Sequence, residues 1–143
     1  MAIRLFLAMR SELFIKSFTR SISRNTKQPI TVVGSCETTE EIEPLFKHLK
    51  PDILIMDIKI SNNFTFSQMR RLILQFPQIK IIGVSAEYHQ DIAQLLEQAG
   101  SKAYLRRNDD KSTIENLIYE VWKGNTAIYR VNLPNNPYPN FGQ

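Results

Sequence analysis

Short apolar runs alternate along the chain with longer segments in which apolar residues return every three or four positions. A continuous apolar run of a few residues is typical of a strand that is buried on both faces. The longer segments carry a single apolar stripe, which predicts an amphipathic helix. The expected strands are Ile3–Ala8, 30–34, Ile53–Asp57, 80–84 and 103–105.

Five helices are predicted, one after each apolar run, by the spacing of their apolar residues. The first helix covers 11–24, where Phe14, Phe18 and Ile22 follow one another at four-residue intervals. The stripes of the other four are Ile42, Leu45, Phe46 and Leu49; Met69, Leu72, Ile73 and Phe76; Ile92, Leu95, Leu96 and Ala99; and Ile114, Leu117, Ile118 and Val121.

Short signals indicate where the helices begin and end. In a capping box, a serine or threonine and a glutamate three residues later bond each other's backbone N–H groups. A glycine directly after a helix adopts the left-handed conformation that ends it. The sequence predicts two such boxes, Thr38 with Glu41 and Ser112 with Glu115, and two such ends, Gly100 and Gly124.

Strands that alternate with helices predict a parallel sheet covered on both faces. Because crossover connections are right-handed, the sheet should be open and doubly wound. We therefore expect an α/β fold of the flavodoxin-like kind, a three-layer α/β/α sandwich with a five-stranded parallel sheet in the order 2-1-3-4-5. Residues 1–125 would form this domain, and 126–143, rich in proline and asparagine, a tail or linker.

Composition narrows the functional classes. The net charge of +4 is spread along the chain, as on an ordinary solvated surface. Cys36 is the single cysteine, and His48 and His89 lie far apart, so neither a disulfide nor a metal site is expected. Since no apolar run reaches the ~20 residues of a membrane span, we expect a cytoplasmic protein without membrane contact.

Common enzyme motifs are missing from the sequence. It contains no glycine-rich phosphate loop, no dinucleotide-binding turn and no G-x-S-x-G elbow. What remains is a set of polar residues at strand ends, where open α/β sheets place their functional groups. Asp57, Ser85 and Arg107 would meet there. A carboxylate nucleophile beside a hydroxyl and a cation suits an acyl-phosphate site.

Three segments carry a resemblance to a known family. They are Lys-Pro-Asp-Ile-Leu-Ile-Met-Asp-Ile at 50–58, Val-Ser-Ala at 84–86 and Ala-Gly-Ser-Lys-Ala-Tyr-Leu-Arg-Arg at 99–107. Over roughly residues 3–125 the chain resembles response-regulator receiver domains, in style those of LuxR/NarL-type regulators. The resemblance implies that Asp57 is the phosphoacceptor, that Ser85 and Arg107 contact the phosphoryl group, and that Tyr104 turns inward on activation.

The sequence departs from this family at the expected site. Two acids that help to hold Mg²⁺ follow the first strand in the family, whereas Met9 and Arg10 stand here. Arg107 replaces a lysine, and a guanidinium fork differs in shape from an ammonium group. The loop at 59–65 is expected to be polar and lacks the family's Met-Pro-Gly-x-x-G pattern. We hypothesise that the Arg10 side chain pairs with Asp57 and supplies the missing positive charge.

These departures predict a degenerate receiver, or pseudo-receiver, that is not an enzyme and has no catalytic residue. We expect it to bind no cofactor, to hold Mg²⁺ weakly or not at all, and to act by phosphorylation-independent contact with a protein partner, either a sensor kinase or a regulatory protein. The alternative is a phosphoacceptor domain of a DNA-binding transcriptional regulator, with its output domain outside this chain. Direct nucleic-acid binding is not expected, while the resemblance makes a homodimer a further expectation.

Overall fold

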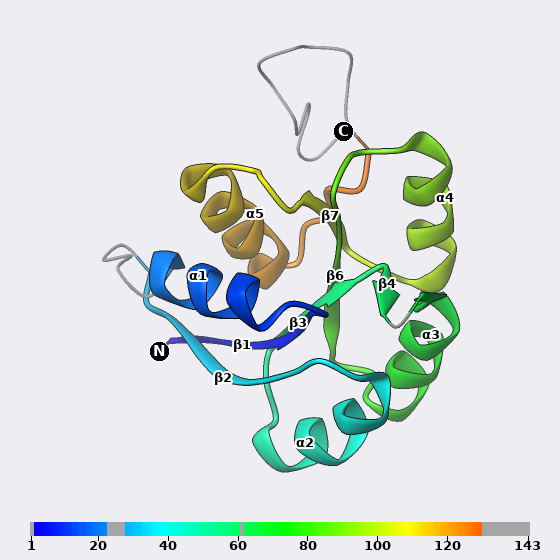
Figure 1. Ribbon diagram of the computed structural model, residues 1–143, viewed down its shortest axis with the longest axis horizontal. Helices are drawn as coiled ribbons and strands as arrows, with labels where there is room; N and C mark the ends of the chain where they lie inside the picture. The colour runs from blue at the N-terminus through cyan, green and yellow to red at the C-terminus, as the bar shows by residue number, and fades with distance from the viewer. Residues whose placement is uncertain (1, 23–27, 61, 130–143) are drawn as a thin grey trace.

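The computed structural model describes residues 2–22, 28–60 and 62–129 (Figure 1). Within these residues, no helix has both the length and the apolar character needed to cross a membrane. The main strands are β1 (Ile3–Ala8), β2 (Ile30–Cys36), β3 (Ile53–Asp57), β6 (Lys80–Ser85) and β7 (Ala103–Arg106), and the helices are α1 (Glu12–Ile22), α2 (Ile42–Leu49), α3 (Phe66–Gln75), α4 (Gln90–Ala99) and α5 (Lys111–Lys123).

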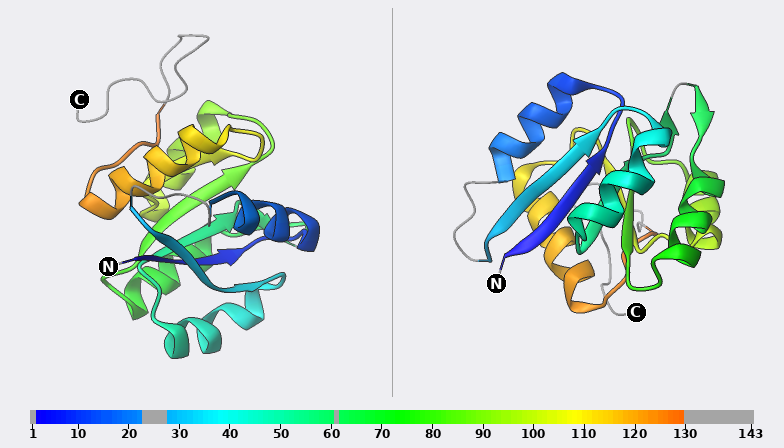
Figure 2. Two further views of the ribbon diagram at one scale, coloured as in Figure 1. Left: turned by 90° about the vertical axis from the view of Figure 1, so that its left-hand side faces the viewer. Right: turned by 90° about the horizontal axis from the view of Figure 1, so that it is seen from below.

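The main sheet is parallel and has the strand order β2-β1-β3-β6-β7. Counting only these strands, this is the predicted order 2-1-3-4-5, so the predicted fold class is confirmed. The views in Figures 1 and 2 show α1 and α5 on one face of the sheet and α2, α3 and α4 on the other. Each face has its own apolar cluster, which makes the three layers.

The centre of the sheet is apolar on both faces, as its continuous apolar runs predict. Every residue of β3 is buried, and so are five of the six residues of β1. The predicted helix stripes extend a little too far, because Leu45 and Leu95 are 36% and 39% exposed. Asp57 is therefore a carboxylate at the end of the most buried strand.

The first predicted capping box is wrong. A short 3-10 turn, η1 (Thr39–Glu41), precedes α2, and the Thr38 side chain makes no capping hydrogen bond. The α-helix itself begins only at Ile42. At its other end, Lys50 takes the left-handed conformation with φ 50°, one residue before Pro51.

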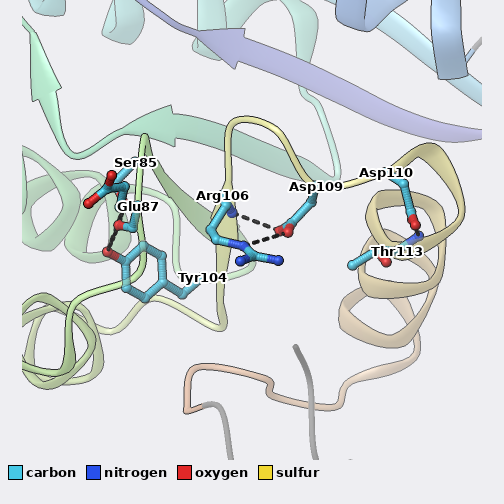
Figure 3. Close-up of polar contacts among 7 residues, drawn as sticks. All are labelled: Ser85, Glu87, Tyr104, Arg106, Asp109, Asp110 and Thr113. Carbon is cyan, nitrogen blue, oxygen red and sulfur yellow. Dashed lines mark hydrogen bonds and ion pairs between the residues drawn. The ribbon is translucent and has the colours of Figure 1, made fainter. Parts of the chain in front are cut away.

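The second predicted capping box is also wrong. Helix α5 begins at Lys111, and its cap is Asp110, whose Oδ1 accepts the N–H of Thr113 at 2.8 Å (Figure 3). An aspartate is as good a cap as a serine, and its carboxylate also favours the positive end of the helix. Ser112 consequently lies within the first turn. The two predicted glycine ends are confirmed, with φ 95° at Gly100 and 109° at Gly124.

The loop after β3 contains more structure than expected. Two short antiparallel strands, β4 (Lys59–Ile60) and β5 (Asn63–Phe64), form a hairpin next to the end of β3. Ile60 is 2% exposed, so this segment is only partly polar. The ring of Phe64 stacks on Phe66 with centroids 5.5 Å apart. The hairpin thus replaces the polar loop predicted at 59–65.

The segment that follows α5 packs against the edge strand β7. The Ala127 N–H donates to the Lys102 carbonyl at 2.7 Å, and the Tyr104 N–H donates to the Ala127 carbonyl at 3.2 Å. Ala127 and Ile128 are both buried. The domain boundary expected at residue 125 stays a prediction, and this packing favours a boundary a few residues later. The predicted tail at 130–143 lies outside the described residues.

Candidate functional site

Asp57 lies at the edge of the sheet where β1, β3, β6 and β7 all end. Its side chain is 3% exposed. The backbone around it is fixed on both sides, because the Ile58 N–H donates to the Val84 carbonyl at 2.9 Å and the Thr65 hydroxyl donates to the Asp57 carbonyl at 2.7 Å. The carboxylate is consequently held at one place in a nearly water-free setting.

Both carboxylate oxygens of Asp57 have partners. Oδ1 accepts a hydrogen bond from Nη2 of Arg107 at 2.8 Å, which is also an ion pair. Oδ2 accepts the backbone N–H of Arg10 at 2.9 Å. Charge-assisted bonds of this length are among the stronger ones in proteins. The negative charge of Asp57 is therefore balanced by an arginine of the same chain.

The hypothesis that the Arg10 side chain pairs with Asp57 is wrong. That side chain is exposed, and Arg10 contributes only its backbone N–H. Arg107 reaches Asp57 instead, because its own N–H is bound to the Ser85 carbonyl at 2.7 Å. This bond fixes the start of the loop after β7 beside the end of β6. Both arginines follow strands that end at this edge, and only the path of the loops decides which of them points inward.

The turn behind Arg107 is held by an aspartate that the sequence did not single out. Asp109 accepts the Arg106 N–H at Oδ2 and the Arg106 Nε–H at Oδ1, both at 2.8 Å (Figure 3). Asp109 is 8% exposed. Aspartate is one of the residues that dominate turns, and this preference could have marked Asp109.

Ser85 and Tyr104 meet each other and the backbone of the loop that follows β6. Their hydroxyl oxygens are 2.7 Å apart, and both hydroxyls bond to the Glu87 carbonyl, Tyr104 at 3.1 Å (Figure 3). The His89 N–H donates to the Tyr104 hydroxyl at 3.3 Å. Tyr104 is completely buried. These bonds tie the loop between β6 and α4 to β7.

The end of β1 provides no acidic group. Met9 is completely buried, and its N–H donates to the Cys36 carbonyl at 3.1 Å. Burial raises the pKa of the Cys36 thiol to about 12, so this thiol stays protonated and is a poor nucleophile. Within the described part of the chain, no group of three or more His, Cys, Asp or Glu side chains is arranged to hold a metal ion.

No family model matches the chain. The response regulator GacA of Pseudomonas aeruginosa is 27% identical over 99 residues, which cover 69% of this chain and 46% of the relative. The uncharacterized transcriptional regulatory protein YhcZ of Bacillus subtilis is 32% identical over 79 residues, or 55% of this chain and 37% of the relative. The chain thus matches less than half the length of these curated relatives.

Solved structures of receivers superpose over most of the chain. A LuxR-family two-component response regulator from Aurantimonas has a TM-score of 0.79 at 18% identity, with 87% of each chain covered. The signal receiver domain of NarL from Mycobacterium tuberculosis has a TM-score of 0.77 at 18% identity, covering 86% of this chain and 98% of its own. The chain thus has the fold of response-regulator receivers and is similar in sequence to a response regulator over 69% of its length.

Proposed function

We propose that this chain is the receiver-like signalling module of a two-component phosphorelay system and that it works by protein–protein contact without phosphorylation. The observation that carries the proposal is the ion pair between Arg107 and Asp57 at 2.8 Å. A phosphoacceptor attacks the phosphoryl donor through a carboxylate oxygen, and a hydrogen bond from a guanidinium makes that oxygen a weaker nucleophile. Here both oxygens are bound within the chain.

The donor groups present do not fit Mg²⁺. This ion requires nearly octahedral oxygen ligands, usually with one or two carboxylates. Asp57 ends β3 at this edge, and the guanidinium that contacts its Oδ1 would repel a dication. The residues after β1 are a buried methionine, Met9, and an arginine. Phosphoryl transfer relies on charge stabilisation, so a site of this composition should perform it poorly.

The hydroxyl network supports the same proposal. The hydroxyls of Ser85 and Tyr104 lie 2.7 Å apart, and both contact the Glu87 carbonyl, so the completely buried Tyr104 is held in one place within the chain. We propose that the surface formed by the β6–α4 loop, α4 and β7 is presented to a partner in this fixed conformation.

The partner we propose is a protein, either a sensor kinase or another regulatory protein, and a homodimer through α4, β7 and α5 is a further proposal. Leu95 on α4 and Tyr119 on α5 are each 39% exposed and offer apolar area. Light scattering on the purified chain measures the oligomeric state directly. A monomer at all concentrations would exclude the homodimer and leave the proposal of a different partner intact.

Intact-mass spectrometry tests the central proposal. The chain is incubated with Mg²⁺ and a small phosphodonor, beside a response regulator known to accept phosphate as the positive control. We expect no phosphoryl adduct on the wild-type chain under conditions that modify the control. An adduct that Asp57→Asn abolishes would overturn the proposal.

The same experiment addresses a second candidate, a phosphoacceptor domain of a DNA-binding regulator. Two observations favour it: Asp57 stands at the end of β3, and the matched relatives are regulators more than twice as long as the aligned part. An adduct on Asp57 would show that it is a phosphoacceptor and would favour this function over the first.

A further inference from the structure

The guanidinium of Arg107 has a second contact besides Asp57. Its central carbon lies 5.4 Å from the centroid of the Phe14 ring, on the first helix. A cation within about 6 Å of a ring face is attracted by the negative charge of that face. Phe14 is half-buried, so water screens this attraction only in part. The guanidinium is therefore bound by a carboxylate from β3 and by an aromatic ring from α1.

The hydrogen bonds that bring Arg107 to Asp57 leave one of its donors unsatisfied. Its Nε is buried and donates to no acceptor in the described part of the chain. Burying a donor without an acceptor costs free energy, so an arginine free to move would turn this N–H toward water. The ion pair with Asp57 offsets part of this cost, and the ring of Phe14 supplies a second attraction on the same guanidinium.

Phe14 is itself well placed to hold the arginine. Its N–H is bound to the Ser11 hydroxyl at 3.2 Å, in the first turn of α1. Its ring lies 6.0 Å from that of Phe18, which is 5% exposed and anchors α1 to the core. A planar guanidinium can lie against such a ring and point an N–H at a carboxylate at the same time, whereas the ammonium of a lysine is a compact point charge.

We propose that Phe14 is a positioning residue that holds the Arg107 guanidinium against Asp57, so that α1 helps to determine whether Asp57 is covered. The inference rests on the proposed function, because covering Asp57 matters only if this carboxylate is to be kept from phosphorylation. Leucine at position 14 would fill similar space but would lack the π face that attracts a cation. The guanidinium would then lose the attraction that keeps its Nε buried.

Nuclear magnetic resonance of the Arg107 Nε–H tests the role directly. In the wild type we expect a separate resonance, shifted by the ring current of Phe14 and slow to exchange with water. Phe14→Leu should move this resonance toward the position of exposed arginines and speed its exchange. Phe14→Tyr, which keeps a ring, should restore both properties. The matched control is Phe18→Leu, on the same helix, which should leave the resonance in place although it lowers stability.

A resonance that Phe14→Leu leaves unchanged, or that Phe18→Leu changes equally, would overturn the inference. A double-mutant cycle of Phe14→Leu with Arg107→Ala adds a second measurement. We expect the two changes to be coupled by about two- to fivefold in the unfolding equilibrium constant, the size of a partly exposed cation–ring contact.

The two proposals can fail separately. If the wild-type chain forms the Asp57 adduct, phosphorylation-independent action is wrong, and the resonance still decides the role of Phe14. If the wild type forms no adduct and Phe14→Leu leaves the Arg107 Nε–H resonance unchanged, only the positioning role is wrong.

Discussion

At the scale of single residues, the ion pair between Asp57 and Arg107 should contribute strongly to stability. Arg107→Ala leaves a buried carboxylate with only the Arg10 N–H as partner. Breaking a fully buried pair costs about 3–5 kcal/mol, and because the Arg107 side chain is 32% exposed we expect about 2 kcal/mol. Urea denaturation at neutral pH measures the loss.

The control for this prediction removes the negative charge of Asp57 instead of the positive charge of Arg107. In an Asp57→Asn background, Arg107→Ala should cost clearly less than in the wild type, because no unpaired carboxylate remains. Equal losses in the two backgrounds would mean that the arginine stabilises the fold by packing alone.

The hydroxyl of Tyr104 provides a second test at this scale. Tyr104→Phe keeps the buried ring but removes the hydroxyl that donates to the Glu87 carbonyl and accepts the His89 N–H. Because the Glu87 carbonyl keeps Ser85 as a donor, we expect a modest loss of about 1 kcal/mol in the free energy of unfolding. In a Ser85→Ala background the carbonyl has lost that donor, so the loss on Tyr104→Phe should be larger. Additive losses in the double variant would show that the hydroxyls act independently.

At the scale of elements, the sequence predicted the features that depend on burial. It missed those for which two neighbouring residues could play the same role. The central strands were predictable because burial on both faces leaves a continuous apolar run, as in Ile53–Asp57. The start of α5 was not, because two capping signals stand within a few residues and Asp110 captures the Thr113 N–H first. The same holds at the site, where the sequence brought Asp57 and Arg107 together but did not exclude Arg10.

The cap of α5 gives a pH-dependent prediction. The Thr113 backbone N–H holds the pKa of Asp110 below its usual value. A group with a lowered folded-state pKa contributes stability that is present above its unfolded-state pKa and is lost as pH falls through the folded-state pKa. The stability difference between the wild type and Asp110→Asn should therefore be largest near neutral pH and shrink below about pH 4. Thermal unfolding across this range measures it.

Asparagine is the appropriate replacement because its side-chain oxygen also caps helices and does not titrate. Asp110→Ala serves as the second control, since it removes the cap at every pH. A difference between the wild type and Asp110→Asn that stays constant from pH 7 to pH 3 would contradict the assigned role of the charge.

At the scale of the whole molecule, the packing of 126–129 against β7 decides where the domain ends. A chain that stops after Asn125 loses the Ala127 bonds to Lys102 and Tyr104 and exposes the edge of β7. It also loses the buried side chain of Ile128, which by itself contributes about 1.5–3 kcal/mol. A chain that stops after Tyr129 keeps all of these contacts.

We therefore expect the chain ending at Tyr129 to match the full chain in its free energy of unfolding, and the chain ending at Asn125 to be less stable by about 2–3 kcal/mol. Urea denaturation of the three chains decides the matter. Equal stability of the two shortened chains would place the boundary at residue 125, as the change in composition suggested. A loss only in the shorter chain would show that the last part of the fold is the segment packed on the edge of β7. The sequence did not predict this segment, because a single parallel bridge between Ala103 and Ala127 leaves no periodic pattern of apolar residues.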